Sequence, residues 1–314
     1  MIICISLNPA IDRRLHVGQL EIGRVNRAHF ARPAPGGKAT HVAMTAQRLG
    51  ADVTWVGLAG GATGDECARG LASLGIPSVI VKTGSATRVN LEIIDREGTI
   101  TEILEPGGVI KPEELDEMFI VCHQLFARHE NNAQVVLAGS LPPSVPSNFY
   151  FRLAREAHAY SCRVLLDTSG EALVAGLEAS PDFVKPNRDE AEWMLGRPVR
   201  DEQAALDASR LMTQCGAQSV AVSLGADGLL WSNAAEQKII VARPPTVAVR
   251  STVGCGDATV AGFAVAASRS LDMEETVRLA VACGAANCLA DSPGMINAEK
   301  VRELASMVSV RLAS

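Results

Sequence analysis

The chain has 314 residues, of which 47% are hydrophobic and 20% are charged, and its formal net charge is −6. This length is enough for one large α/β domain, or for two ordinary domains, that bury most of their apolar surface. The acidic balance argues against a general nucleic-acid-binding protein and against a protein that binds acidic membranes.

The N-terminal segment, MIICISLNPAIDRRL, has no basic stretch before its short apolar run, and no later segment reaches roughly 18 uninterrupted apolar residues. We therefore expect neither an export signal nor a membrane span. The eight cysteines form no C-x-x-C pair, and Cys4, Cys162 and Cys283 lie in apolar surroundings. Such cysteines are typically buried and reduced, which favours a cytoplasmic protein.

Short β-branched runs alternate with longer segments rich in Ala and Leu along most of the chain. The runs lie near Val53, Val135, Val164, Val184 and Val220, and the expected helices include Glu114–Arg128, Phe149–Ala159 and Gln203–Cys215. Continuous apolar runs suit parallel strands that helices cover on both faces. We predict an α/β fold with a doubly wound, mostly parallel sheet flanked by helices. Because no repeat, low-complexity tract or linker divides the chain, residues 1–314 are expected to form a single domain.

Two segments depart from this alternation of buried strands and helices. In TRVNLEIIDREGTITEIL, Val89, Leu91 and Ile93 alternate with polar residues, and a turn leads into a second alternating strand. The segment from Arg13 to Arg32, earlier in the chain, has a similar extended pattern with alternating polar residues. We expect strands inserted at about 11–33 and 86–106 to pair as a small β-sheet lid. Its apolar outer face favours a homodimer joined through the lid.

Polar residues follow the first strand, at the end of the sheet where ligands of open parallel sheets bind. In NPAID, Asp12 either accepts hydrogen bonds from sugar hydroxyls or closes a turn. PGGKAT is not a Walker A loop, because Arg32 replaces its first glycine and Ala39 replaces its Ser or Thr. Gly37 lets the backbone approach a small substrate and Lys38 suits an anionic one; the alternative is an ordinary turn before a helix.

Two further motifs suit a nucleotide. FVKPNRDEAEWM places Asn187 and Glu190 three residues apart at a helix start, where both can reach a magnesium–phosphate site, through water, or form a capping box. SLGADGLL adds a strand followed by turns at Gly225 and Gly228, which border a nucleotide or shape a hairpin.

The segment STVGCGDATVAGF sets Gly254 and Gly256 one residue apart, directly before Asp257 and a run of small helical residues. The N-terminus of a helix binds anions, glycines let a phosphate approach its backbone, and an aspartate there can take a proton from an attacking hydroxyl. The alternative is a glycine turn in which Asp257 only caps the helix.

Taken in order, NPAID, GGK, the TR-led hairpin, AGSLPP, KPNxxE, SLGxxG and GxGD resemble the ribokinase/PfkB family of sugar kinases over roughly residues 2–300. VNR at Val25 to Arg27, SLPPS, EALVAGL and STVGCGD are most similar to the branch of 1-phosphofructokinases and tagatose-6-phosphate kinases. The resemblance implies a ribokinase-like fold and phosphoryl transfer from ATP, with Mg²⁺, to a hydroxyl of a phosphorylated ketohexose.

The resemblance also implies a role for each matching residue. Asp257 would be the catalytic base, beside an anion hole made by the backbone N–H groups of Gly254, Cys255 and Gly256. The residues implied for ATP are Lys185, Asn187, Ser223, Gly225, Gly228 and Asn287, and those for magnesium are Glu190 and Asn187, through water. The residues implied for the sugar phosphate are Asp12, Gly37, Lys38 and His41, with Arg88, Arg27 and Lys38 for its phosphate group.

The chain departs from the branch at one motif. The branch reads GGKGxNVA where this chain reads GGKATHVA, so Ala39 replaces a glycine and His41 replaces an asparagine whose amide would meet the sugar. The identity of the sugar phosphate is therefore left open. A dehydrogenase is disfavoured, because the first strand is not followed by G-x-G-x-x-G. A non-catalytic sugar or nucleotide sensor on a kinase fold is the remaining alternative.

Overall fold

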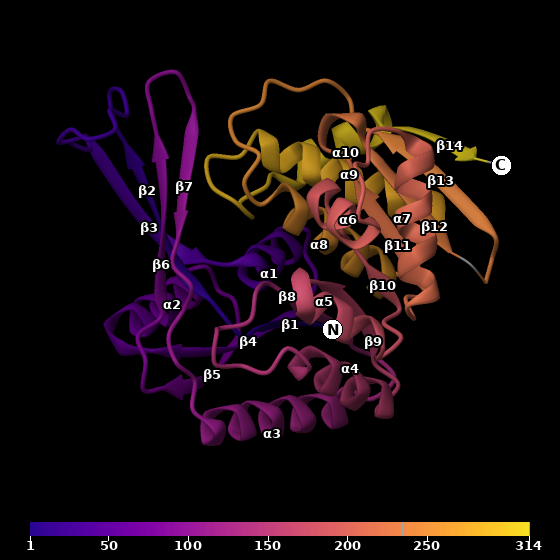
Figure 1. Cartoon of the computed structure of the whole chain (residues 1–314), viewed down its shortest axis with the longest axis horizontal. Helices are drawn as coiled ribbons and strands as arrows, with labels where there is room; N and C mark the ends of the chain where they lie inside the picture. Colours follow the sequence, from indigo (N-terminus) through magenta and orange to yellow (C-terminus); the bar gives the residue numbers. More distant parts are fainter. Residues whose placement is uncertain (234, 314) are drawn as a thin grey trace.

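The computed structural model describes residues 1–233 and 235–313, and over these residues the main sheet has ten strands. In sheet order they are β14 (Ser309–Ala313), β13 (Lys238–Arg243), β12 (Leu229–Asn233), β11 (Ser219–Ser223), β10 (Phe183–Val184), β9 (Arg163–Asp167), β8 (Gln134–Ala138), β1 (Ile2–Ser6), β4 (Val53–Gly60) and β5 (Ser78–Thr83). The strands from β11 to β5 are parallel, and β12, β13 and β14 extend the sheet as antiparallel strands. The chain starts inside the sheet and ends at its edge (Figure 1).

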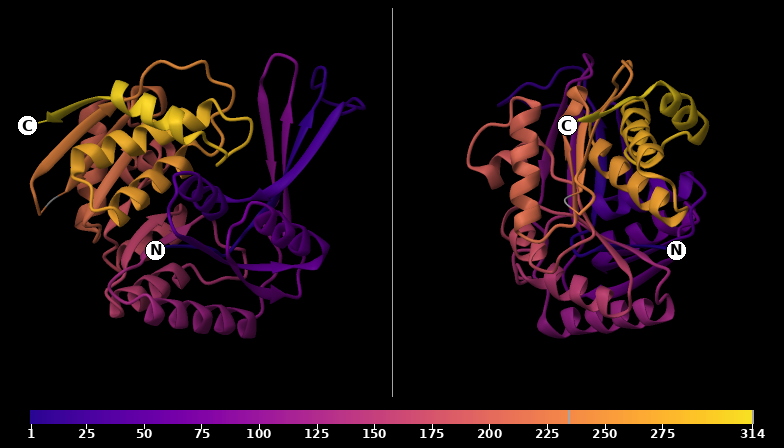
Figure 2. Two further views of the ribbon diagram at one scale, coloured as in Figure 1. Left: turned by 180° about the vertical axis from the view of Figure 1, so that it is seen from behind. Right: turned by 90° about the vertical axis from the view of Figure 1, so that its right-hand side faces the viewer.

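Helices cover both faces of the main sheet. One face carries α1 (Lys38–Arg48), α2 (Gly61–Ser73), α8 (Cys255–Ser268), α9 (Met273–Cys288) and α10 (Ala298–Met307). The other carries α3 (Pro112–Arg128), α4 (Phe149–Ala159), α5 (Gly170–Leu177), α6 (Arg188–Leu195) and α7 (Glu202–Gln214). Figure 2 shows the two layers on either side of the strands. A hydrophobic core lies on each face of the main sheet. Along β1, Ile2 and Cys4 pack into the core under α1 and α8, and Ile3 and Ile5 pack into the core under α3 and α4, because successive side chains of a strand point to opposite faces. The predicted fold class is confirmed.

A separate four-stranded sheet stands out from the body (Figure 1). Its order is β3 (Phe30–Gly36), β2 (Ala10–His16), β6 (Arg88–Ile94) and β7 (Ile100–Leu104), with β2 and β6 parallel. We call it the lid sheet. Its pairing sets Asp12 beside Asn90 and Arg14 beside Glu92. All four of these polar residues are buried, whereas the alternate residues of β6 are only partly buried, so the polar face of the lid sheet is the covered one.

No helix in the described ranges is long and apolar enough to cross a membrane. Cys4, Cys162 and Cys283 are buried free thiols, as predicted. The expected helices are present with small shifts at their ends: α3 starts at Pro112 because a proline at the first helical position and a hydrogen bond of 2.8 Å from the Lys111 N–H to Oε2 of Glu114 stabilise that start.

Candidate active site

A cavity of about 1040 Å³ lies at the carboxyl ends of the parallel strands, between the main sheet and the lid sheet. Its walls come from segments far apart in the sequence, including Asp12 of β2, the first turn of α1, the end of β9 and the first turn of α8. Fifteen of the predicted site residues line it: Asp12, Gly37, Lys38, His41, Arg88, Lys185, Asn187, Glu190, Ser223, Gly225, Gly228, Gly254, Cys255, Gly256 and Asp257.

The N-terminus of α8 opens into this cavity. Gly254 precedes the helix in the left-handed conformation, with φ 77°, and a Cβ atom there would lie 2.7 Å from the Cβ of Pro293. The position therefore requires glycine. No side chain caps this helix start, and of the three predicted anion-hole donors the N–H of Cys255 already donates to the Thr252 carbonyl at 3.3 Å. Asp257, in the first turn, is buried beside the first backbone N–H groups of the helix.

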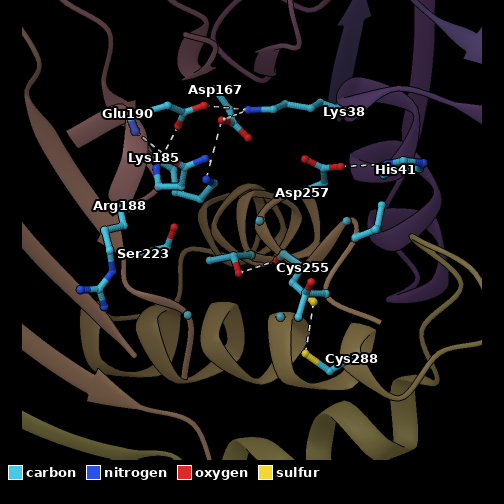
Figure 3. A pocket seen from close by; sticks show the side chains of 18 of the residues that line it. Lys38, His41, Asp167, Lys185, Arg188, Glu190, Ser223, Cys255, Asp257 and Cys288 are labelled. Atoms are coloured by element: carbon cyan, nitrogen blue, oxygen red, sulfur yellow. Dashed lines mark hydrogen bonds and ion pairs between the residues drawn. The ribbon is translucent and has the colours of Figure 1, made fainter. Parts of the chain in front are cut away.

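His41 links the two carboxylates that the sequence motifs single out. Its Nδ1 lies 2.8 Å from Oδ2 of Asp257, and its Nε2 lies 3.0 Å from Oδ2 of Asp12. Figure 3 shows His41 and Asp257 pointing toward each other across the cavity wall. Burial alone would lower the pKa of His41, but hydrogen bonds to the two carboxylates raise it to about 10. At neutral pH the side chain is therefore an imidazolium that donates to both.

Two hydrogen bonds hold the carboxylate of Asp12. Its Oδ1 accepts a hydrogen bond of 2.9 Å from Nδ2 of Asn90, and its Oδ2 accepts one from His41. Burial would raise the pKa of Asp12, but these hydrogen bonds keep it below its usual value. A Cβ atom at Gly36 would lie only 2.1 Å from the Asp12 carboxyl carbon, so the first glycine of PGGKAT makes room for this aspartate.

A buried ion pair lies next to Asp12 on the same face of the lid sheet. Nε of Arg14 donates to Oε2 of Glu92 at 2.8 Å, and Nη1 of Arg14 donates to the Asp291 carbonyl. Because Asp291 follows α9 in the body, this arginine joins the lid sheet to the helical side of the cavity. The sequence motifs do not single out Arg14.

On the opposite wall, charged side chains form a second network. Nζ of Lys38 lies 2.9 Å from Oδ1 of Asp167 and 3.3 Å from Oε1 of Glu190, and Nζ of Lys185 lies 3.7 Å from the same Asp167 oxygen. Figure 3 shows Lys38 directed toward this cluster, on the far side of Asp257 from His41. Burial would lower the pKa of Lys38, but Asp167, Glu190 and Asp257 raise it above its usual value. Lys38 therefore contacts Asp167 and Glu190.

Asp167 is the main site residue that the sequence analysis missed. It ends β9, it is 1% exposed, and its Oδ2 is buried with no hydrogen-bond partner among the described residues. Burial would raise the pKa of Asp167, but Lys185 and Lys38 lower it. The signal was a charged residue that directly follows the apolar run of an expected strand, at the end of the sheet where ligands bind. Asn90 was missed as a partner of Asp12 because only strand pairing brings the two together.

Two of the motifs that left two interpretations open form the expected local structure and also line the cavity. Asn187 and Glu190 form a capping box at the start of α6, and both line the cavity. The remaining oxygen of Glu190 faces Lys38. Gly225 and Gly228 shape the turn of the β11–β12 hairpin and also line the cavity.

Arg88 is anchored at the junction between the lid sheet and the body. Its Nε donates to the Asn8 carbonyl at 3.2 Å and its Nη1 to the Glu105 carbonyl at 2.8 Å. Arg27 lies outside the cavity lining, exposed in the loop that joins β2 and β3. Asn287 is buried behind the lining, where its side chain donates to the Val253 carbonyl at 2.7 Å and supports the loop before α8.

The fold and the site define a class of protein: a phosphotransferase with a carboxylate at an open helix N-terminus and a polar lid over the cavity. Residues 2–299 match the family model described as pfkB family carbohydrate kinase, so the chain belongs to this family. It is 36% identical over 308 residues to the 1-phosphofructokinase of Rhodobacter capsulatus, covering 98% of this chain and 96% of that protein. It is 32% identical over 311 residues to the 1-phosphofructokinase of Bacillus subtilis (strain 168), covering 99% of each.

A comparison with solved structures supports the same family. The phosphofructokinase-2 of Escherichia coli in complex with fructose-6-phosphate superposes with a TM-score of 0.89 at 28% sequence identity, covering 98% of each chain. The expected family is confirmed, and with it the expected class of enzyme, an ATP-dependent sugar-phosphate kinase.

Proposed function

We propose that this kinase transfers the γ-phosphoryl group of ATP to a hydroxyl of a phosphorylated ketohexose, with fructose 1-phosphate as its principal substrate. The observation that carries the proposal is the position of Asp257, a buried carboxylate in the first turn of α8 beside uncapped backbone N–H groups. A base and an anion-binding backbone at one helix start suit the attack of a hydroxyl on a phosphoryl group. The names of the R. capsulatus and B. subtilis relatives support the choice of substrate.

In this proposal Asp257 accepts the proton of the attacking hydroxyl. Backbone N–H groups at Gly254 and Gly256 stabilise the negative charge on the transferring group, aided by the positive end of the α8 dipole. The N–H of Cys255 joins them by exchanging its bond to the Thr252 carbonyl for one to the transferring group. Lys38 and Lys185 supply positive charge on the wall of the cavity that carries Asp167. The sugar hydroxyls contact the opposite wall, at the lid sheet.

For the sugar phosphate we propose Asp12 and Gly37 as contacts to hydroxyls and Arg88 as the contact to the existing phosphate. A guanidinium anchored by two backbone carbonyls can hold a phosphate with two parallel hydrogen bonds. His41 brings a positive charge to a position where the branch has a neutral amide, between the base and Asp12. It therefore sets which hydroxyl arrangement is accepted.

For the nucleotide we propose the wall formed by Lys185, Asn187, Ser223, Gly225 and Gly228, which lies beside the β11–β12 hairpin. Asn287 is buried, lies outside the cavity lining and holds the loop before α8, so in this proposal it does not contact ATP.

Magnesium fits the unpartnered Oδ2 of Asp167 together with Glu190. The described residues contain no group of three metal-ligating side chains. Mg²⁺ is commonly held by one or two carboxylates with water and substrate phosphates, so two carboxylates suffice. When bound, the ion would neutralise charge on the ATP phosphates. Chelation by EDTA should abolish turnover, and excess Mg²⁺ should restore it.

We further propose that residues 1–314 act as one cytoplasmic kinase domain and that two copies associate through the lid sheets. The outer face of the lid carries Leu91, partly exposed, and Ile103, 53% exposed, which lie opposite each other on β6 and β7. Light scattering should give a dimer mass at micromolar concentration, and Ile103→Glu should give the monomer mass. A wild-type monomer would contradict the association.

The test of the function is coupled ATP turnover against a panel of hexose phosphates and the corresponding neutral sugars. We expect the highest kcat/KM with fructose 1-phosphate. If no sugar phosphate stimulates ATP turnover, the chain is a sensor on a kinase fold.

A further inference from the structure

Two thiols meet beside the predicted anion hole. Cys255 is the first residue of α8 and Cys288 is the last residue of α9, and their Sγ atoms lie 3.2 Å apart. Both line the cavity and both are partly exposed (Figure 3). Cys4, Cys67, Cys122, Cys162 and Cys283 are buried, and Cys215 is exposed on the surface. A small oxidant that enters the cavity therefore reaches a pair of thiols already in contact.

The two sulfurs differ in reactivity. The hydrogen bond from the Cys255 thiol lowers the pKa of Cys288 to about 7, and the same hydrogen bond together with burial raises the pKa of Cys255. A thiolate is the nucleophile in thiol chemistry. The contact of the two sulfurs at 3.2 Å places the Cys255 thiol to resolve a product formed on Cys288.

The backbone at these cysteines supports the loop that leads into the anion hole. The carbonyl of Cys288 accepts hydrogen bonds from the N–H of Arg250 at 2.8 Å and of Ser251 at 3.4 Å. The Cys255 thiol lies 3.8 Å from the carbonyl of Ser251. A disulfide brings its sulfurs to about 2.05 Å, closer by more than one ångström than they lie here. Forming it joins the first residue of α8 covalently to the last residue of α9, beside the loop that leads into the anion hole.

We propose that Cys255 and Cys288 are an oxidation site, at which hydrogen peroxide or an organic hydroperoxide forms a reversible disulfide that inactivates the kinase. The Cys288 thiolate attacks one oxygen of the peroxide, the O–O bond breaks, and the departing hydroxide takes a proton to become water. The Cys255 sulfur then attacks the sulfenic sulfur, and the second hydroxide leaves as water with the Cys255 proton. Two thiols and one hydrogen peroxide thus give one disulfide and two waters. With an organic hydroperoxide an alkoxide leaves in place of the first hydroxide, and the products are one disulfide, one alcohol and one water.

The first test is independent of the proposed function. Purified protein is treated with hydrogen peroxide, alkylated and digested with trypsin without reduction. Cleavage after Arg250 and Arg269 isolates Cys255 in peptide 251–269, and cleavage after Arg278 and Lys300 leaves Cys288 in peptide 279–300 together with Cys283. We expect a cross-linked pair that is lighter than its two reduced peptides by two hydrogen atoms, and fragmentation that assigns the link to Cys288. Recovery of both peptides as alkylated thiols, or a link to Cys283, would overturn the proposal.

The second test concerns activity and rests on the proposed function. Peroxide should lower kcat/KM of the wild type by roughly a hundredfold, the scale of a lost anion-hole donor, and dithiothreitol should restore it. Cys288→Ser and Cys288→Ala should keep their activity under the same treatment. Cys215→Ser, which removes the exposed thiol, should be inactivated as fast as the wild type. Equal inactivation of the Cys288 variants would overturn the inactivating role, while the mass measurement would still report on the disulfide.

Discussion

The two ends of the cavity are built differently. At the catalytic end, one continuous segment, residues 251–257, supplies the glycine conformation, the helix start and the carboxylate. At the lid end, the polar groups come from β2, α1 and β6 and hold one another in place by charge: Asp12 with Asn90 and His41, and Arg14 with Glu92. His41 is the link between the two ends.

The two kinds of construction separate chemistry from selectivity. An anion hole made of backbone groups depends on local geometry, so it changes little when neighbouring side chains change. A network of buried charges depends on every member, because removing one leaves its partners unpaired. We expect substitutions at the catalytic end to affect turnover and substitutions at the lid end to affect the choice and affinity of the sugar phosphate.

The sharpest test of this division is Asp257→Asn. The amide cannot accept the proton of the attacking hydroxyl, so kcat should fall by about 10²–10⁴-fold or more, while KM for ATP stays within about threefold. Steady-state kinetics measure both. Asp189→Asn, the same change at an exposed carboxylate of the same cavity, is the matched control and should keep its turnover. A kcat of Asp257→Asn within tenfold of the wild type would remove Asp257 from the mechanism.

At the lid end the largest effect is expected from Arg88→Met. Hydrogen bonds to charged groups contribute about 1.5–3 kcal/mol, so KM for the sugar phosphate should rise roughly 10–100-fold while KM for ATP is nearly unchanged. Arg96→Met, at the exposed turn of the same hairpin, should change neither constant. An equal rise in both KM values would show that Arg88 supports the lid sheet and does not bind the phosphate.

The link between the ends is tested by His41→Asn, which restores the residue of the branch. Removing the imidazolium frees Asp12 and Asp257 from their shared partner and returns an amide to the cavity. The ratio of kcat/KM between fructose 1-phosphate and tagatose 6-phosphate should shift by about tenfold, the scale of one hydrogen bond. His123→Asn, at an exposed histidine of α3, is the control. If the ratio is unchanged, selectivity is set elsewhere in the lid.

The last test concerns stability. The pKa of His41 is raised from 6.5 to about 10 in the folded protein, so its ion pairs stabilise the fold fully below about pH 6.5 and lose that contribution as the pH rises toward 10. The Tm of the wild type minus that of His41→Asn should therefore shrink between pH 6 and pH 10, by roughly 2–4 °C for each kcal/mol lost. Thermal denaturation across this range measures it. A constant difference would show that His41 is not an imidazolium in the folded protein.

Much of the site was predictable because its signals are local. Gly254, Gly256 and Asp257 are adjacent in the chain, and a helix start follows from them directly. The capping box of Asn187 and Glu190 is equally local. By contrast, Asp167 ends an ordinary apolar strand, and its only local signal is a charge at the carboxyl end of that strand. Arg27 is exposed and Asn287 is buried because of how the loops fold back onto the body. The spacing of residues in the sequence does not predict this.

The amino-acid sequence by itself determined the order of strands and helices, the glycine turns and the helix start that carries Asp257, since each depends on residues a few positions apart. Only the tertiary structure decided which side chains meet across the cavity. The parallel pairing of β2 with β6 places Asp12 against Asn90, and the packing of α1 beside α8 places His41 between two carboxylates. The meeting of α8 and α9 likewise places Cys255 against Cys288. Such contacts join residues tens to hundreds of positions apart, and their energies depend on distance and burial, which only the folded chain defines.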